Sequence, residues 1–196
     1  MPEAAFFTRF GLFAAEEFLD GATSARVAAE IRERGGRPAT VSLSAEHVDE
    51  AYRRTTLADV SEATRTLVED RLRASLPAMA RHFDEPVEDM ERAQFLLYRE
   101  GDHFRRHSDS PPTGKPSPDG MVRRISLVLF LNGEGEADRA DSYGGGQLTF
   151  YGLMGETVGL PVAGRPGLLV AFRSELVHAV TPVTHGERCT VVSWFR

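Results

Sequence analysis

The chain has 196 residues, of which 41% are hydrophobic and 27% are charged, a balance typical of a globular domain and not of a disordered chain. The net charge of −6 disfavours a general nucleic-acid-binding surface, so we expect no nucleic-acid partner. The single cysteine, Cys189, excludes an internal disulfide and is typical of a reducing compartment, where we expect it to be a structural residue.

The region of residues 1–93 predicts mainly helices. Residues 22–34 carry apolar side chains at helical spacing and end at Gly35-Gly36, a helix stop. A longer helix begins near Ser61, a suitable N-cap, and Pro77 is expected to kink or split it. We expect one apolar stripe of this helix to pack against a sheet, and its members are Leu67, Leu72, Leu76 and Met79.

From residue 94 onward the sequence predicts short strands separated by turns. The seven runs are 94–98, 103–109, 123–131, 146–151, 167–172, 176–181 and 188–195. Many short strands behind a helical layer indicate an α+β fold that is mainly β: a double-stranded β-helix, or jelly roll, with the N-terminal helices packed on one sheet. We therefore expect residues 1–196 to form a single domain, with 1–93 as a mainly helical support region and 94–196 as the jelly-roll core.

The tripeptide His107-Ser-Asp109 is a candidate metal-binding motif. Because side chains alternate along a strand, the run 103–109 would place His103, Arg105, His107 and Asp109 on one face. Two imidazoles and a carboxylate form the ligand set that suits non-heme Fe(II). The alternative is a polar loop that precedes the turn at Pro111-Pro112.

Two histidines compete for the position of the distal ligand. His178 lies in an apolar strand pattern, whereas His185 lies in a segment that predicts a turn. A hairpin through residues 182–187 would bring Arg188 beside the strand of His178, with Trp194 on the same side. We therefore choose His178. His185, His47 and His82 are expected at the surface, and His103 at the mouth of the pocket.

The final strand alternates between two sets of side chains. Arg188, Thr190, Val192 and Trp194 share one face, and Cys189, Val191, Ser193 and Phe195 share the other. An arginine beside a metal is the group that would bind a carboxylate-bearing co-substrate through two hydrogen bonds. The loops 110–120 and 138–146 are rich in glycine or proline, and we leave open whether they form a lid or are plain connectors.

From about Gln94 to the end, the sequence resembles the Fe(II)/2-oxoglutarate-dependent dioxygenase superfamily, and within it the prolyl 4-hydroxylase branch. The resemblance rests on Tyr98-Arg-Glu-Gly-Asp-His-Phe-Arg-Arg-His-Ser-Asp109, Leu129-Phe-Leu-Asn132, Gly145-Gly-Gln-Leu148, His178 and the run from Arg188 through Trp194. The resemblance implies that His107, Asp109 and His178 ligate the iron. It also implies that Arg188 binds the distal carboxylate of 2-oxoglutarate, and that Tyr98 contacts this co-substrate.

The sequence departs from the family pattern at two positions. Phe104 replaces a common tyrosine, and Phe130 stands where some prolyl hydroxylases place a tyrosine hydroxyl on the co-substrate. The second departure leaves more of the carboxylate binding to Arg188, assisted by Thr190 or Ser126.

The expected function is hydroxylation of an unactivated C–H bond, with release of succinate and CO2. The expected cofactors are Fe(II), 2-oxoglutarate and O2, with ascorbate as an optional addition. The substrate is either a proline in a peptide or protein, or a free amino acid or biosynthetic small molecule. A more remote alternative is a metal- or sugar-binding jelly roll without turnover.

No apolar run reaches the roughly 18 residues of a membrane span. The N-terminus also shows no signal-peptide pattern. We therefore expect a cytoplasmic protein without a membrane partner. We leave its oligomeric state open.

Overall fold

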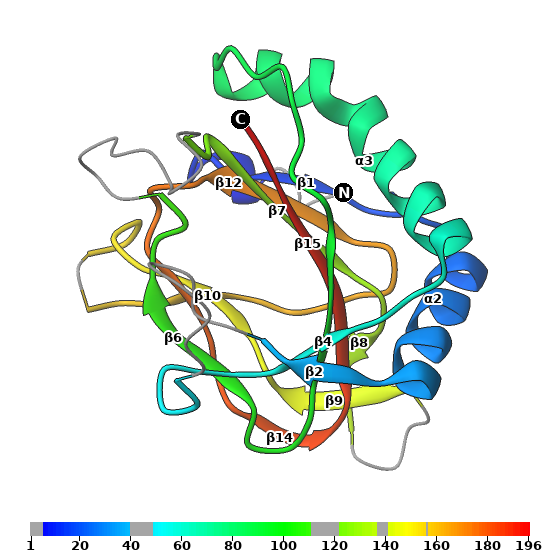
Figure 1. Ribbon diagram of the computed structural model, residues 1–196. Coiled ribbons are helices and arrows are strands. Elements are labelled where there is room, and N and C mark those ends of the chain that lie inside the picture. Colours follow the sequence, from blue (N-terminus) through cyan, green and yellow to red (C-terminus); the bar gives the residue numbers. More distant parts are fainter. Residues whose placement is uncertain (1–5, 40–48, 111–121, 137–140, 156) are drawn as a thin grey trace.

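The computed structural model describes residues 6–39, 49–110, 122–136, 141–155 and 157–196. In this part of the chain, two helices lie against one side of a body made of β-strands (Figure 1). These helices are α2 (Gly21–Arg34) and α3 (Glu62–Phe83).

The strands form two main sheets and one small sheet, in which every pair is antiparallel except the parallel pair β8–β9. In spatial order the large sheet contains β1 (Phe13–Ala15), β12 (Leu169–Arg173), β7 (Ile125–Phe130), β15 (Arg188–Phe195), β5 (Gln94–Tyr98), β4 (Thr56–Ala58) and β2 (Gly36–Pro38). The second sheet contains β11 (Leu160–Val162), β10 (Leu148–Phe150), β13 (His178–Val180), β6 (His103–His107) and β3 (Arg53–Arg54). The small sheet contains β14 (Val183–Gly186), β9 (Ser142–Gly145) and β8 (Gly133–Glu134).

The predicted fold class, a mainly β jelly roll with helices on one sheet, is confirmed. Each of the seven predicted runs contains a strand. The division into a mainly helical support region and a jelly-roll core stays a prediction. In residues 1–93, helices α2 and α3 contribute 14 and 22 residues. Four short strands, β1 to β4, lie in the same region and pair with strands of both main sheets. Strands of two or three residues are too short to show an alternating pattern in the sequence.

Both helices begin at capping side chains. Asp20 accepts a hydrogen bond from the Thr23 amide at 2.8 Å, and α2 ends at Gly35 with φ +61°. Ser61 is the N-cap of α3, as predicted, and accepts from the Thr64 amide at 3.3 Å. The helix continues through Pro77, so of the two predicted effects the split is not observed, and the kink stays a prediction.

The apolar stripe of α3 packs against the large sheet, as predicted for Leu72 and Met79. Leu67 is 39% exposed and does not belong to the buried stripe, which Val68 and Phe83 join instead. Met79 and Phe83, which follow the proline, are buried and stabilise the continuous helix. Burial of each large apolar side chain contributes about 2 kcal/mol to the free energy of folding.

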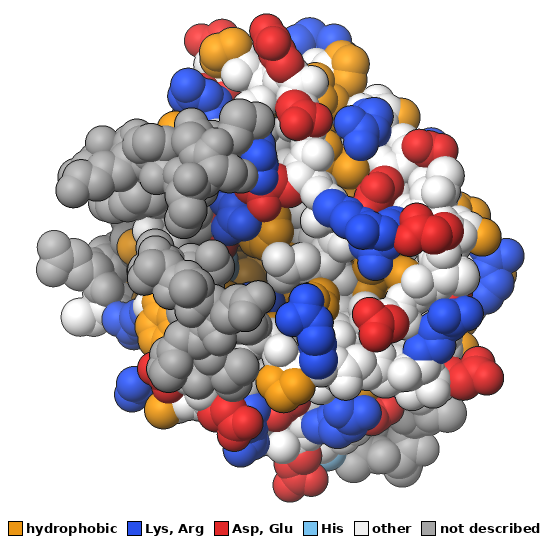
Figure 2. All heavy atoms as spheres, in the orientation of Figure 1, with side chains coloured by type: hydrophobic (Ala, Val, Ile, Leu, Met, Phe, Trp, Pro, Cys, Tyr) orange, Lys and Arg blue, Asp and Glu red, His pale blue; other side chains and the backbone are white. Residues whose placement is uncertain are grey.

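Alternation along the central strand β7 separates two cores. Ile125, Leu127 and Leu129 pack toward the helices, whereas Val128 and Phe130 pack toward the second sheet. The interior between the two main sheets is therefore lined by alternate residues of the large sheet. In the space-filling view, this face of the molecule is hollowed beside the residues drawn in grey, with hydrophobic side chains in the hollow (Figure 2).

In the described part of the chain, no helix combines the length and the apolar character that crossing a membrane requires.

Cys189 lies on the helix side of β15 and is fully buried. Burial raises the pKa of its thiol to about 11, although Arg32 nearby acts in the opposite direction. Because the thiolate is the reactive form, we predict that native protein does not react with a thiol reagent such as DTNB at pH 8. The measurement is release of the coloured thiolate, with protein unfolded in guanidinium as the control that reacts fully. Rapid labelling of native protein would mean that β15 opens readily and would contradict this packing.

Candidate metal and co-substrate site

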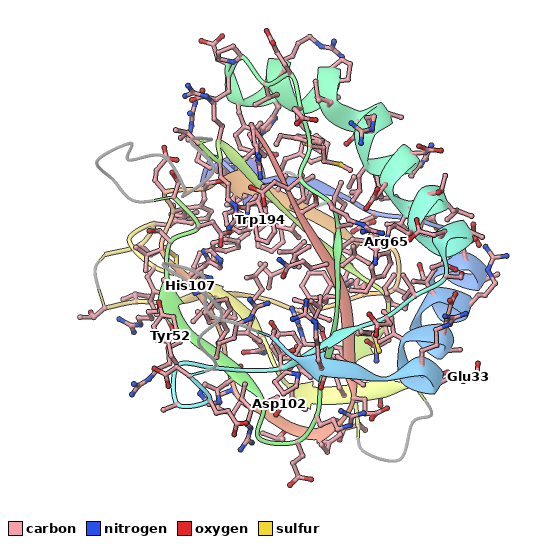
Figure 3. The ribbon with its side chains drawn as sticks, viewed as in Figure 1. Glu33, Tyr52, Arg65, Asp102, His107 and Trp194 are labelled. Atoms are coloured by element: carbon pink, nitrogen blue, oxygen red, sulfur yellow. The ribbon has the colours of Figure 1, made fainter. Side chains whose placement is uncertain are left out.

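A cavity of about 380 Å³ lies between the two main sheets. Its walls include Tyr98, Arg188 and Trp194 from the large sheet, and Phe104 and His178 from the second sheet. Tyr52 and His107 lie on the β6 side of this cavity and Trp194 on β15, whereas Glu33 on α2 points away from it (Figure 3).

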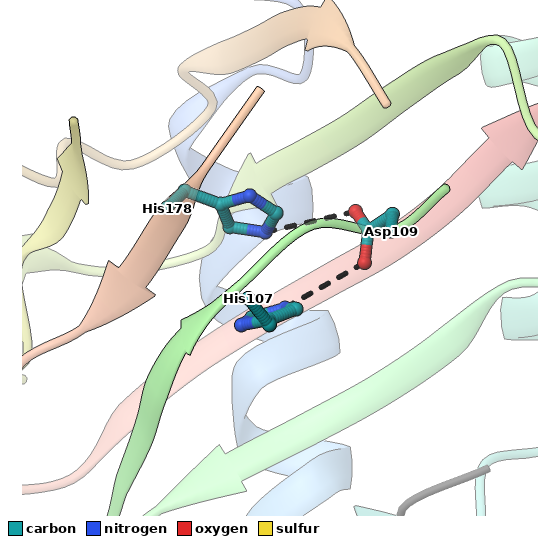
Figure 4. A group of neighbouring side chains, drawn as sticks. All are labelled: His107, Asp109 and His178. Carbon is teal, nitrogen blue, oxygen red and sulfur yellow. Dashed lines mark ion pairs between the residues drawn. The ribbon is translucent and has the colours of Figure 1, made fainter. Parts of the chain in front are cut away.

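His107, Asp109 and His178 meet at one point on the cavity wall (Figure 4). Their ligand atoms all lie within 4.8 Å of one another. The Nε2 atom of His107 is 3.6 Å from Asp109 Oδ1, and the Nε2 atom of His178 is 3.6 Å from Asp109 Oδ2. The structure therefore brings together the three residues that the sequence proposed as one ligand set.

The tautomers of the two histidines leave Nε2 free to bind a metal. His107 Nδ1 lies 2.7 Å from the Arg105 carbonyl oxygen, and His178 Nδ1 lies 2.9 Å from the Leu176 carbonyl oxygen. Since a carbonyl oxygen only accepts, both Nδ1 atoms carry the proton and donate. Such a bond to the second ring nitrogen fixes the orientation of metal-binding histidines.

Asp109 is held by two neighbouring serines. Its backbone amide donates to the Ser174 carbonyl oxygen at 2.8 Å, and the Ser126 hydroxyl donates to its Oδ2 at 2.7 Å. Ser126 Oγ also lies 2.9 Å from Ser174 Oγ. Ser126 therefore orients the carboxylate of Asp109. The sequence had offered Ser126 as an assistant to Arg188 instead.

The electrostatic environment keeps the cluster in the protonation state that a metal requires. Burial alone would raise the pKa of the Asp109 carboxyl, but His178, His107 and Ser126 outweigh it and hold the pKa well below its usual range. Burial lowers the pKa of His178 to about 4, despite the opposing effect of Asp109. At neutral pH the cluster therefore carries an ionised carboxylate and a neutral His178.

A β-bulge in β6 positions His107. His178 pairs with His107 and Val180 pairs with Phe104, so β6 has one extra residue between these two pairs. The bulge places Phe104 on the cavity side, where its ring stacks on His107 with centroids 3.6 Å apart. The predicted strict alternation through 103–109 is therefore wrong.

His103 lies outside the cavity wall as a consequence. Its ring nitrogens lie 3.1 Å and 3.3 Å from the carbonyl oxygens of Gly101 and Ala51. The expected place at the pocket mouth is not observed, because the extra residue of the bulge rotates His103 away.

Arg188 is the first residue of β15 and is buried, with a relative exposure of 1%. Its guanidinium carbon lies 4.9 Å from the ring centre of Tyr98 and 5.1 Å from that of Phe130. Its Nη1 donates to Thr190 Oγ1 at 3.2 Å, and its Nε has no hydrogen-bond partner among the described residues. A buried guanidinium that has a hydroxyl and two aromatic rings as neighbours is suited to an anion.

Gly146, which follows β9, leaves room for Arg188. Gly146 has φ +57°, and a Cβ there would lie 2.9 Å from Arg188 Cδ. Any larger residue would displace the arginine.

The predicted loop 138–146 is a strand from Ser142 to Gly145, and residues 137–140 lie outside the described part of the chain. Residues 111–121 also lie outside it, so the lid hypothesis stays a prediction.

The predicted hairpin between His178 and Arg188 is wrong. Residues 183–186 form β14, which pairs with β9 and leads the chain from the second sheet to the large one. His178 and Arg188 therefore face the cavity from opposite sheets.

His185 lies in strand β14 and not in a turn. It is half-buried, with Nε2 3.0 Å from the Gly135 carbonyl oxygen. His82 is exposed as predicted, and His47 lies outside the described residues.

Two cavity residues from the N-terminal region were missed by sequence analysis. Tyr52 packs edge-on against Phe104, with ring centres 5.7 Å apart. Arg53 Nη2 donates to Gln94 Oε1 at 3.4 Å, and its guanidinium carbon lies 4.8 Å from the Phe104 ring centre. Neither residue belongs to a motif, and β3 has only two residues, so no signal in the sequence pointed to them.

The residues present fit the proposed metal on chemical grounds. Two imidazole nitrogens with fixed tautomers and one ionised carboxylate form a set that leaves open positions on an octahedral Fe(II). The neighbouring buried guanidinium fits the distal carboxylate of a bound 2-oxo acid.

Comparison with known proteins gives the same class. Residues 93–196 match the 2OG-Fe(II) oxygenase superfamily. PKHD-type hydroxylases from Maricaulis maris (strain MCS10) and Hyphomonas neptunium are 35% and 37% identical over 99 residues. Each alignment covers 50% of this chain and 39% of the relative, so the chain spans about two fifths of the length of these curated relatives.

Solved structures resemble the described fold over nearly the whole chain. A Pseudomonas putida prolyl-4-hydroxylase has a TM-score of 0.67 and 29% identity, with 95% of this chain and 92% of that chain covered. A Trichoplax adhaerens prolyl hydroxylase, solved with a hypoxia inducible factor peptide fragment, has a TM-score of 0.71 and 15% identity, with 98% and 86% covered, and shows the fold alone.

The chain belongs to the 2OG-Fe(II) oxygenase superfamily. The superfamily is defined by its use of Fe(II) and 2-oxoglutarate, which agrees with the cofactors that the sequence led us to expect. The roles of individual residues remain proposals.

The lowered pKa of His178 predicts how the stability of the metal-free protein depends on pH. Between about pH 4 and 6.5 the unfolded chain binds a proton at this residue that the folded protein does not. The free energy of unfolding should therefore fall as the pH is lowered through this window, by about 1.4 kcal/mol per pH unit from this group.

Urea unfolding of chelator-treated protein at several pH values measures this slope, and His178→Gln should flatten it. The same slope in the variant would show that other groups are responsible.

Proposed function

We propose that this protein is an Fe(II)- and 2-oxoglutarate-dependent hydroxylase, with His107, Asp109 and His178 as the iron ligands and Arg188 as the partner of the distal carboxylate. One observation carries this proposal. The three metal-ligating side chains and the buried guanidinium face the same cavity from opposite sheets. Family membership agrees with it.

The charges along the cavity complement a 2-oxo diacid. At one end the carboxylate of Asp109 and the neutral imidazole of His178, together with the ring of His107, favour a divalent cation. At the other end Arg188 offers a positive charge that is buried beneath Tyr98 and Phe130. A metal bound at the first end supplies Lewis acidity and redox chemistry with O2, and a molecule with a chelating head and an anionic tail satisfies both ends.

The protein side chains position the reactants. Ser126 holds one oxygen of Asp109, and the Arg105 and Leu176 carbonyl oxygens hold the two rings, so the ligands need little rearrangement when a metal binds. Tyr98 lies beside the Arg188 guanidinium, where it would contact the chain of a bound co-substrate. Trp194 and Val128 line the cavity and help to exclude water from the reaction.

The non-catalytic alternative, a metal- or sugar-binding jelly roll, does not account for Arg188. Burying a guanidinium without an anion is costly, and a binding module would have no need of it at this position. We therefore favour turnover over simple binding.

Anaerobic addition of Fe(II) and 2-oxoglutarate tests the site. The chelate should give a visible charge-transfer absorbance that is lost in His107→Ala, because one of three protein ligands is removed. Arg188→Ala should weaken 2-oxoglutarate binding by about 100-fold while Fe(II) affinity changes little, because a charge-assisted pair is worth a few kcal/mol.

Tyr151→Phe is the control for this experiment, since Tyr151 does not line the cavity. A colourless wild-type mixture would favour the binding module. Equal losses of iron and 2-oxoglutarate in Arg188→Ala would show that the arginine supports the fold instead.

For the substrate, we propose a proline in a peptide or protein, with a free amino acid or small molecule as the second candidate. The relative with 29% identity over nearly the whole chain is a prolyl-4-hydroxylase, which supports the first candidate. The aromatic side chains that line the cavity, Tyr52 and Phe104 on one side and Trp194 on the other, suit a proline ring.

Succinate release across a panel of proline-containing peptides, free proline and other amino acids distinguishes the two. We expect stimulation above the uncoupled rate by peptides only, with ascorbate added in a parallel series. Stimulation by free amino acids and not by peptides would reverse the assignment.

A further inference from the structure

Tyr143 is a buried polar residue that neither the motif nor the proposed ligand set includes. It lies in β9 with 1% of its surface exposed, and its hydroxyl has no hydrogen-bond partner among the described residues. A buried hydroxyl without a partner costs roughly 1–3 kcal/mol, so such groups in native proteins usually have a ligand or water to bind.

The surroundings of Tyr143 place it beside Arg188. A Cβ built on Gly146 would lie 2.9 Å from Arg188 Cδ and 3.5 Å from Tyr143 Cε2, so the tyrosine ring flanks the stem of the arginine. Burial raises the pKa of the Tyr143 hydroxyl and the charge of Arg188 opposes this by lowering it, so the guanidinium lies near this hydroxyl.

The hydroxyl itself lies beside Phe130. A Cβ built on Gly164 would overlap the Tyr143 hydroxyl and would come within 2.7 Å of Phe130 Cδ1. Phe130 in turn packs 5.1 Å from the guanidinium carbon of Arg188. The Tyr143 hydroxyl and the Arg188 guanidinium thus border the same aromatic ring.

Two donors near this ring are left without a partner in the described residues, Arg188 Nε and the Tyr143 hydroxyl. A carboxylate has two oxygens and accepts several hydrogen bonds at once. Burial raises the pKa of Tyr143, which keeps its hydroxyl protonated and able to donate at neutral pH. The ring of Phe130, which carries no hydroxyl, borders both donors.

We infer that the Tyr143 hydroxyl donates a hydrogen bond to the distal carboxylate of 2-oxoglutarate bound at Arg188, and so takes the place of a hydroxyl that Phe130 cannot supply. This inference rests on the proposed function of the cavity. It makes Tyr143 a residue that determines specificity for the length and charge of the co-substrate tail, and gives β9 a role in the site.

The test compares 2-oxoglutarate with 2-oxobutanoate, which has the same chelating head but lacks the distal carboxylate. Binding of each to Fe(II)-loaded protein is measured anaerobically by the charge-transfer absorbance, in wild type and in Tyr143→Phe. We expect the dissociation constant for 2-oxoglutarate to rise about 10- to 100-fold, because a hydrogen bond to a charged group is lost. The constant for 2-oxobutanoate and the affinity for Fe(II) should change by less than about twofold.

The double variant Tyr143→Phe/Phe130→Tyr moves the hydroxyl to the neighbouring ring, and we expect it to recover most of the lost affinity for 2-oxoglutarate. Tyr151→Phe is the matched control, because the Tyr151 ring packs under Arg106. Thermal unfolding of each variant shows whether the fold is retained.

An unchanged affinity for 2-oxoglutarate in Tyr143→Phe would overturn the inference while leaving the proposed function intact. Equal weakening of both 2-oxo acids would also overturn it, since Tyr143 would then act on the metal or the fold. A wild-type protein that shows no 2-oxoglutarate absorbance would instead overturn the proposed function, and this inference with it.

Discussion

The ionised carboxylate of Asp109, buried between two imidazoles, is the interaction on which the site depends. Desolvation alone would favour the neutral acid, yet the neighbouring histidines and Ser126 hold the carboxyl ionised. Burial keeps His178 neutral at physiological pH, so this histidine does not supply a full positive charge to balance it. A divalent cation compensates this arrangement directly, and its binding would stabilise the folded state in proportion to its affinity. The cluster is therefore built to gain stability from a metal.

The jelly roll explains why this carboxylate and a buried guanidinium can share one cavity. Asp109 and the two histidines come from strands of the second sheet or directly after them, whereas Arg188 comes from β15 of the large sheet. Opposite charges on facing sheets would attract each other if the cavity were narrow. The cavity separates these groups, and the rings of Tyr98 and Phe104 form part of its wall. The same separation suits a co-substrate that has a chelating head and an anionic tail.

Much of this arrangement could be predicted from sequence, because alternation carries information wherever a strand is long enough. The eight residues of β15 show correctly that Arg188 and Trp194 face the interior and Cys189 faces the helices. Prediction failed where one residue changes the register. The bulge in β6 moved Phe104 into the cavity and His103 out of it, and no local composition marks such an insertion. The segment 182–187 looked like a turn because of Gly186, yet it forms β14.

Strand β3 shows why residues before the family-matched region matter to the site. The match begins at residue 93, but Tyr52 and Arg53 line the cavity and pack on Phe104, whose other face stacks on His107. Because Arg53 pairs with Phe104 across β3 and β6, the position of the His107 ring depends on a strand of only two residues. Such a strand has too few hydrogen bonds to be stable alone and is held by the side chains it covers. The N-terminal region is therefore part of the cavity wall, and removing it would expose strand β6 at the edge of its sheet.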